Sequence, residues 1–186
     1  MTTGHVFMAQ SLDGFIAARD HGLDWLAART DPDEDHGYEA FMASIDGIVM
    51  GRATFRTVLG FETWPYSKPV IVLSNSLTDA DIPPELAQKV RLAQLGPHQL
   101  MQQLSKAGWH RAYIDGGQTV QSFLRAGLIA DITLTLVPVL LGEGRRLFGE
   151  VETEIDLALQ EAKAFASGLV QLRYDVKPPA AAASSD

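Results

Sequence analysis

Two segments of this chain pass from a short apolar run, through glycine, into a helical pattern, and this order restricts the fold strongly. The first is 49–55, with Gly51 before Arg52, and the second is 113–120, with Gly116-Gly117. In open α/β sheets, ligands bind where the carboxyl ends of strands meet the amino ends of helices. Those helix ends have unpaired N–H groups and partial positive charge, and glycine lets a phosphate approach the backbone. The second segment therefore predicts a pyrophosphate site, and Arg52 in the first could bind a phosphate monoester.

Each segment also has a purely structural interpretation. A Gly-Gly pair before a helix is often only a tight turn, and an arginine at a helix start is often only solvated. Asp115, next to Gly116, would repel a diphosphate if it pointed inward, so we expect it to cap the helix or to pair with an arginine. Two such sites in one small domain nevertheless favour a dinucleotide with an additional phosphate.

The rest of the pattern predicts an α/β fold. Short apolar runs predict strands at 6–9, 48–50, 70–73 and 112–114. Helical patterns occupy about 35–44, 100–107 and 117–124. Residues 131–137 and 169–176 alternate polar and apolar side chains, which is typical of half-exposed strands. This order predicts a mostly parallel twisted sheet with helices on both faces and antiparallel C-terminal strands.

Length and composition fit a single domain, which we place at 1–176, followed by a flexible tail at 177–186 rich in proline, alanine and serine. With no cysteine, the chain has no disulfide, zinc-thiolate site, iron–sulfur cluster or thiol nucleophile. The net charge of −8 argues against binding to nucleic acid or to an anionic membrane. Because no signal peptide or long apolar run is visible, we expect a cytoplasmic protein. The five histidines lack ligand spacing, so no metal site is predicted.

Four motifs follow one another along the chain: QSLDGFIA at 10–17, VMGRATF at 49–55, DGGQT at 115–119 and PVLLGEGRRLF at 138–148. Together they resemble the dihydrofolate reductase superfamily. The greatest similarity is to the C-terminal reductase domain of bifunctional riboflavin-biosynthesis deaminase-reductases and to its stand-alone relatives. The resemblance implies a three-layer fold and an NADPH-dependent oxidoreductase that transfers hydride to a pyrimidine, pterin or related heterocycle. The 5-amino-6-(5-phosphoribosylamino)uracil reductases are of this type.

The resemblance also implies a set of cofactor-binding residues. The adenosine phosphate and pyrophosphate region would be held by Gly51, Arg52, Ala53 and Thr54, with Ser74 and Asn75 near the 2′-phosphate. The pyrophosphate would be surrounded by Gly116, Gly117, Gln118, Thr119 and Val120. Ala9 would border the nicotinamide.

Reduction of a C=N or C=O bond also needs a proton. The resemblance implies an acidic side chain on the helix before the second strand, and counting back from Gly51 gives Asp35. The acidic stretch 31–35 fits an ordinary helix start equally well. Asp13 is the second candidate for a catalytic role, with a simple turn before Gly14 as its alternative.

Substrate contacts are harder to assign. Trp25, Phe55 and Val137 are candidates, although core packing is the more common role of aromatic residues at such positions. Arg145 and Arg146 could bind a ribose phosphate, but a surface turn explains them more simply.

Two classes of function follow from these observations. The first is the NADPH-dependent reductase, with dihydrofolate reductase proper as an alternative. The second is a non-catalytic nucleotide-binding module on the same fold, which would bind NADPH without oxidising it. Zinc deamination is excluded because its cysteine ligands are absent. We also expect a homodimer, formed through 131–137 and the apolar run 137–141, unless 131–137 is only an edge strand.

Overall fold

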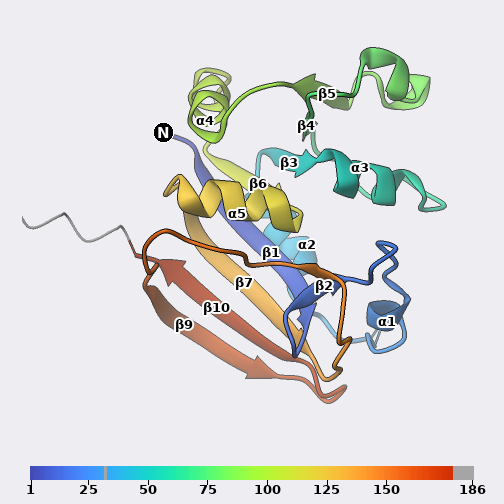
Figure 1. Cartoon of the computed structure of the whole chain (residues 1–186), viewed down its shortest axis with the longest axis vertical. Coiled ribbons are helices and arrows are strands. Elements are labelled where there is room, and N and C mark those ends of the chain that lie inside the picture. Colours follow the sequence, from blue (N-terminus) through green and yellow to red (C-terminus); the bar gives the residue numbers. More distant parts are fainter. Residues whose placement is uncertain (32, 178–186) are drawn as a thin grey trace, which may run out of the picture.

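The computed structural model describes residues 1–31 and 33–177 (Figure 1). The strands of the main sheet are β1 (Thr3–Ser11), β3 (Gly47–Gly51), β4 (Val70–Leu73), β5 (Val90–Ala93), β6 (Arg111–Asp115), β7 (Ile129–Val137), β9 (Leu157–Ala164) and β10 (Val170–Val176). A separate ribbon pairs β2 (Phe15–Ala17) with β8 (Arg145–Arg146). The α-helices are α1 (Asp24–Ala27), α2 (Tyr38–Ser44), α3 (Arg52–Leu59), α4 (Pro97–Lys106) and α5 (Gly117–Arg125). Two single 3-10 turns, η1 (Asp79–Asp81) and η2 (Pro84–Leu86), lie between β4 and β5.

The main sheet has the strand order β5-β4-β3-β6-β1-β7-β10-β9. All pairs from β5 to β7 are parallel, whereas β10 is antiparallel to both of its neighbours. This arrangement confirms the predicted α/β class, including the antiparallel C-terminal strands.

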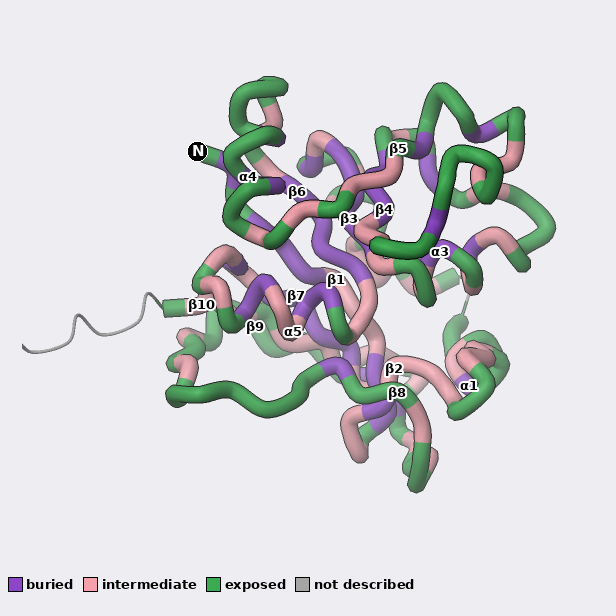
Figure 2. Tube along the Cα trace, turned by 45° about the horizontal axis from the view of Figure 1, so that its top comes forward, coloured by how far each residue is buried: buried purple, intermediate pink, exposed green. Residues whose placement is uncertain are grey.

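Helices cover both faces of the parallel part of the sheet, and the apolar strand residues supply a core to each face. Successive side chains point to opposite faces. Val49 therefore packs in the cluster that contains Leu100 of α4 and Phe123 of α5, whereas Met50 packs with Phe55 of α3. Figure 2 shows the burial concentrated along these central strands. Because both faces are buried, the strands are continuously apolar rather than alternating.

The position of β7 corrects one expectation. This strand is neither an edge nor a half-exposed surface, because it pairs with β1 on one side and β10 on the other. Its polar residues Thr133 and Thr135 are buried, and Thr135 Oγ1 accepts a hydrogen bond of 3.0 Å from Gln171 of β10. Val137 is completely buried as well. The alternation in sequence reflects polar side chains that find partners inside the fold.

Two further details differ from the sequence-based expectations. Helix α2 begins at Tyr38 rather than Asp35, because the backbone N–H groups of Asp33 and Gly37 donate to the carboxylates of Asp31 and Asp35 in successive turns. Strands β5 and β9 were not predicted, and β9 is exposed along almost its whole length, so no periodic pattern marks it. The part of the predicted tail at 178–186 lies outside the described residues.

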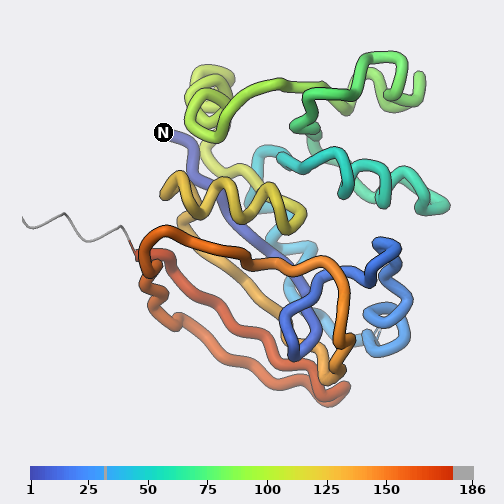
Figure 3. Tube along the Cα trace, in the orientation of Figure 1, coloured from blue at the N-terminus to red at the C-terminus, as the bar shows by residue number. Residues whose placement is uncertain are grey.

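One apolar face remains uncovered in the described part of the chain. Opposite residues of antiparallel strands share a face, so Leu157 and Leu159 of β9 lie beside Val176 and Tyr174 of β10. The segment between β7 and β9 runs back along the sheet beside α5, and β9 and β10 extend beyond it (Figures 1 and 3). Leu157, Leu159 and Val170 are all exposed there.

We propose that a second copy of the chain covers this β9–β10 face, since its exposed large side chains are apolar. Light scattering should then give about 40 kDa, twice the mass of the 20.2 kDa chain. Leu159→Asp should reduce it to the mass of one chain. Leu140→Asp is the matched control, because Leu140 is also exposed but lies in the originally expected run 137–141. A wild-type monomer, or dissociation by the Leu140 variant alone, would contradict this placement.

Candidate functional site

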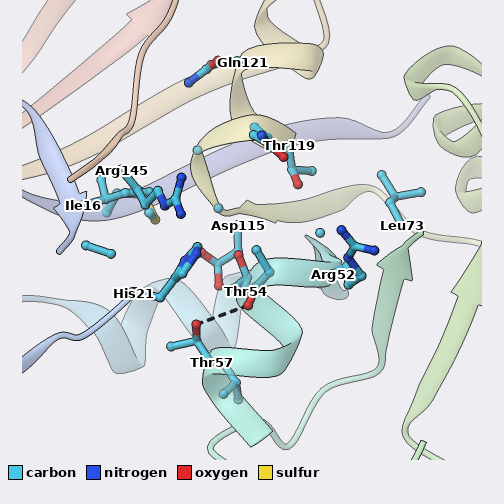
Figure 4. Close-up of a pocket in the computed structure, with 18 of the residues that line it drawn as sticks. Ile16, His21, Arg52, Thr54, Thr57, Leu73, Asp115, Thr119, Gln121 and Arg145 are labelled. Atoms are coloured by element: carbon cyan, nitrogen blue, oxygen red, sulfur yellow. Dashed lines mark hydrogen bonds between the residues drawn. The ribbon is translucent and has the colours of Figure 1, made fainter. Parts of the chain in front are cut away.

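A cavity of about 1280 Å³ lies at the carboxyl ends of the parallel strands. Its walls come from α3, α5, the loop after β4 and the β2–β8 ribbon (Figure 4). This is the place where an open α/β sheet binds ligands. Pockets for single small molecules usually occupy about 300–1,000 Å³, so the cavity has room for a dinucleotide together with a second molecule.

The two glycine-to-helix turns meet in this cavity. Gly51 and Gly116 end adjacent parallel strands, β3 and β6. A Cβ on Gly51 would lie 3.0 Å from Thr119 Oγ1 of α5, and a Cβ on Gly116 would collide with Thr54 Oγ1 of α3. Gly116 also has φ +89°, which disfavours other residues. The amino ends of α3 and α5 are therefore packed side by side, and neither has a side-chain cap for its free N–H groups.

Most of the predicted cofactor residues line this cavity. They are Ala9, Gly51, Arg52, Ala53, Thr54, Ser74, Asn75, Gly116, Gly117, Gln118 and Thr119. Val120 does not line it. Its side chain is completely buried in the core beneath α5, because the first apolar position of this amphipathic helix points to the sheet.

At one end of the cavity, Arg52 lies beside the turn that follows β4. Its Nη1 donates a 2.5 Å hydrogen bond to Ser76 Oγ. The turn is closed by Ser74 Oγ, which accepts from the backbone N–H groups of Ser76 and Leu77 at 3.1 and 3.0 Å. A guanidinium, two hydroxyls and the neighbouring Asn75 amide thus gather in one place. These groups suit a phosphate monoester.

Asp115 differs from both expected structural roles, since its side chain neither caps α5 nor pairs with an arginine. The carboxylate lines the cavity and is 7% exposed, and its Oδ2 accepts a 3.2 Å hydrogen bond from the Tyr66 hydroxyl. Burial raises the pKa of Asp115 to about 6, with the Tyr66 hydrogen bond opposing the shift. Burial and this carboxylate together raise the pKa values of Tyr66 and Tyr113 well above 10, so both phenols stay protonated at neutral pH.

Neither of the predicted catalytic acids lines the cavity. Asp13 accepts hydrogen bonds from Ser11 Oγ at 2.6 Å and from the backbone N–H groups of Leu141 and Gly142 at 3.1 and 2.7 Å. These bonds, above all that from Ser11, lower the pKa of Asp13 to about 2. It is therefore ionised at neutral pH and ties two loops together. Asp35 is exposed before α2.

The predicted substrate contacts Trp25, Phe55 and Val137 also lie outside the cavity. Phe55 is 1% exposed in the core beside α3, and Trp25 packs against Val137 and Leu169 in a small cluster. Core packing, the alternative interpretation of the aromatic residues, is what the structure shows. The wall near Ala9 is formed instead by Phe7, Met8, His21, Leu23, Leu26 and Tyr38. Four of these belong to loops or short helices with no sequence pattern that could have marked them.

A metal site and a membrane-spanning helix are both absent from the part of the chain that the structure describes. No three His, Cys, Asp or Glu side chains are grouped so that they could hold a metal ion. None of its helices is long and apolar enough to cross a membrane.

The fold and the cavity define an open α/β domain in which two uncapped helix amino ends converge on one cavity. The model of the RibD C-terminal domain matches residues 2–171, and the chain belongs to this family. Family membership makes it a homologue of riboflavin-biosynthesis reductases.

Three relatives illustrate the range of the similarity. A protein of Shewanella sp. PV-4, provisionally assigned to riboflavin biosynthesis, is 40% identical with a TM-score of 0.89, over 95% of this chain and 99% of that one. The uncharacterized protein YwjB of Bacillus subtilis is 29% identical over 171 residues, 91% of this chain and 95% of its own length. The diaminohydroxyphosphoribosylaminopyrimidine deaminase/5-amino-6-(5-phosphoribosylamino)uracil reductase of Thermotoga maritima has a TM-score of 0.75 at 11% identity. That match covers 95% of this chain but 57% of the Thermotoga protein, and it shows the shared fold.

The buried carboxylate predicts a pH-dependent gain in stability for Asp115→Asn. The pKa of Asp115 in the folded state, about 6, exceeds the ordinary value of 3.8, so the folded protein loses stability as pH rises between these values. Replacing the group by a neutral isostere should add roughly 3 kcal/mol at pH 8 and much less at pH 4. Thermal unfolding at both pH values measures this difference.

Asp13→Asn is the matched control for that experiment. Because the pKa of Asp13 is lowered, its ionised form stabilises the fold above about pH 4, and the variant should be less stable than wild type at pH 8. If Asp115→Asn is instead less stable than wild type at pH 8, burial of the ionised Asp115 carboxylate does not destabilise the fold.

Proposed function

We propose that this protein is an NADPH-dependent reductase whose acceptor is a pyrimidine, pterin or related heterocycle. The observation that carries the proposal is the meeting of two uncapped helix amino ends in one long cavity, with Arg52 at its far end. A dinucleotide with an additional phosphate has anionic groups in two places, and the cavity offers two matching sets of donors.

The residues that would hold NADPH fall into two groups. The first-turn N–H groups of α5, beginning at Gly117, would bind the pyrophosphate, and the Gly116 and Gly51 turns leave the space it needs. Arg52 with Ser74, Asn75 and Ser76 would bind the 2′-phosphate. Beside them, Leu73, Ala93 and Leu95 form an apolar wall that suits the adenine ring. When bound, NADPH would supply the hydride, which is the chemistry that the protein itself lacks.

Asp115 is the group best suited to supply the proton. Reduction of a C=N or C=O bond places hydride on carbon and a proton on the heteroatom. Below pH about 6 the Asp115 carboxyl holds such a proton, and it is released into the cavity while Tyr66 hydrogen-bonds to the carboxylate that remains. Water reprotonates the carboxylate after each turnover.

The Thermotoga relative bears the name of a uracil reductase, and a pyrimidine acceptor is therefore our first choice. Dihydrofolate reductase proper and a non-catalytic nucleotide-binding module are the alternatives. Oxidation of NADPH by the purified protein separates all three, with 5-amino-6-(5-phosphoribosylamino)uracil and dihydrofolate as acceptors. Binding of NADPH without oxidation by either acceptor would favour the binding module.

Arg52→Ala should reduce selectivity for NADPH over NADH. Charge-assisted hydrogen bonds to a phosphate are worth about 1.5–3 kcal/mol, so the Kd for NADPH should rise roughly 10- to 100-fold while that for NADH changes little. Isothermal titration calorimetry measures both. Arg56→Ala is the control, since Arg56 is an exposed cation on the same helix that does not line the cavity. An equal rise in the Kd for both cofactors would show that Arg52 does not bind the 2′-phosphate.

If Asp115 donates the proton, kcat/KM should fall as pH rises through about 6, because the acid must be protonated to act. Asp115→Asn should lower kcat/KM by about 100-fold or more and flatten this pH profile. Its affinity for NADPH should stay close to that of wild type. An unchanged pH profile in the variant would show that another group supplies the proton.

A further inference from the structure

The β2–β8 ribbon lies against the beginning of α5. Ala17 pairs with Arg145 and Phe15 with Arg146. A Cβ on Gly117, the first residue of α5, would collide with the carbonyl oxygen of Arg146. A Cβ on Gly144 would likewise collide with the carbonyl oxygen of Ala17. The two glycines therefore permit a close approach that fixes the backbone of β8 next to the free N–H groups of α5.

Three arginines surround this ribbon, and two of them have partners of their own. Arg19 forms a 2.6 Å ion pair with Glu143. Arg146 places its guanidinium 4.4 Å from the centre of the Phe15 ring and donates a 3.2 Å hydrogen bond to the carbonyl oxygen of Asp13. Arg146 also lines the cavity, but its guanidinium is engaged by Phe15 and Asp13, as that of Arg19 is engaged by Glu143.

Arg145 differs from its two neighbours. Within the described residues its side chain forms no ion pair, and its one hydrogen bond is a long contact of 3.4 Å from Nη2 to the carbonyl oxygen of Arg19. It lines the cavity, on the wall that also carries Ile16 of β2 (Figure 4). The backbone of β8 thus holds Arg145 beside the uncapped amino end of α5. Because its guanidinium has no carboxylate partner, it retains its full capacity to bind an anion.

We infer that Arg145 is a binding residue for the cofactor pyrophosphate and acts together with the amino end of α5. This inference rests on the proposed function. It assigns two of the arginines that line the cavity to different phosphates, Arg52 to the 2′-phosphate and Arg145 to the pyrophosphate. Arg145 should therefore increase the affinity for NADPH and for NADH equally, whereas Arg52 should increase the affinity for NADPH alone.

The test compares Arg145→Ala with Arg19→Ala by isothermal titration calorimetry, using NADPH, NADH and adenosine 2′-monophosphate as ligands. Arg19→Ala removes the same charge from the same ribbon, but its side chain is 78% exposed and does not line the cavity. Arg145→Ala should raise the Kd for NADPH and the Kd for NADH alike, by roughly tenfold or more. Adenosine 2′-monophosphate lacks the pyrophosphate, so its affinity should change by less than about twofold. Arg19→Ala should leave all three affinities near wild type.

Several results would overturn the inference without touching the proposed function. If Arg145→Ala binds NADPH and NADH as well as wild type does, Arg145 faces a different ligand or only solvent. The effect comes from net charge rather than from a contact if Arg145→Ala loses as much affinity for adenosine 2′-monophosphate as for NADPH. The same conclusion follows if Arg19→Ala loses as much affinity for the two cofactors as Arg145→Ala does. Failure of the wild-type protein to bind either cofactor would instead contradict the proposed function itself. A thermal unfolding scan of each variant confirms that it is folded, since β8 is held by backbone pairing rather than by the Arg145 side chain.

Discussion

The contact between the two glycine turns is the constraint on which the site depends. Gly116 lies against Thr54, and Gly51 lies against Thr119, so each turn packs on the first turn of the other helix. A side chain at Gly116 would displace the Thr54 hydroxyl and would be strained by the positive φ of this residue. The parallel pairing of β3 with β6 brings the turns to the same level, and the buried apolar residues of these strands hold that pairing in place. The meeting of the two helix amino ends at this part of the cavity is therefore a consequence of how the core packs.

The buried Asp115 shows how such a site can reduce the stability of the fold. A carboxylate at the end of a central strand is desolvated, and its raised pKa measures the free energy that ionisation costs in the folded state. The Tyr66 hydroxyl offsets part of that cost. A neutral side chain would stabilise the domain, yet it would also remove the one acid among the described residues that is both buried and in the wall of the cavity. Arg52 and Arg145, by contrast, are exposed and cost the fold little.

The sequence predicted the parallel core and the position of the two glycine turns well, because strong local signals mark them: continuous apolar runs, glycines and amphipathic helices. That these turns bind phosphate stays a prediction. Val120, predicted to bind the cofactor, and Trp25 and Phe55, predicted to contact the substrate, lie in the core and outside the cavity wall. Asp13 and Asp35, the predicted proton donors, lie in acidic turns outside the cavity, whereas Asp115, which was expected to cap α5 or to pair with an arginine, lines it. Tertiary packing alone decides which carboxylate faces the cavity, and the loops that supply His21 and Tyr66 have no periodic pattern to locate them.

The most direct test of this account is a thermal-shift titration of the wild-type protein with NADPH, NADP⁺ and NADH side by side. A ligand at 100 times its Kd stabilises the folded state by about 2.7 kcal/mol. For a domain of this size that corresponds to a rise of roughly 5–10 °C in Tm. The account predicts such a rise with NADPH and NADP⁺ and a clearly smaller one with NADH at the same concentration. No shift with any of the three nucleotides, or equal shifts with NADPH and NADH, would contradict a site built for two separate phosphate groups.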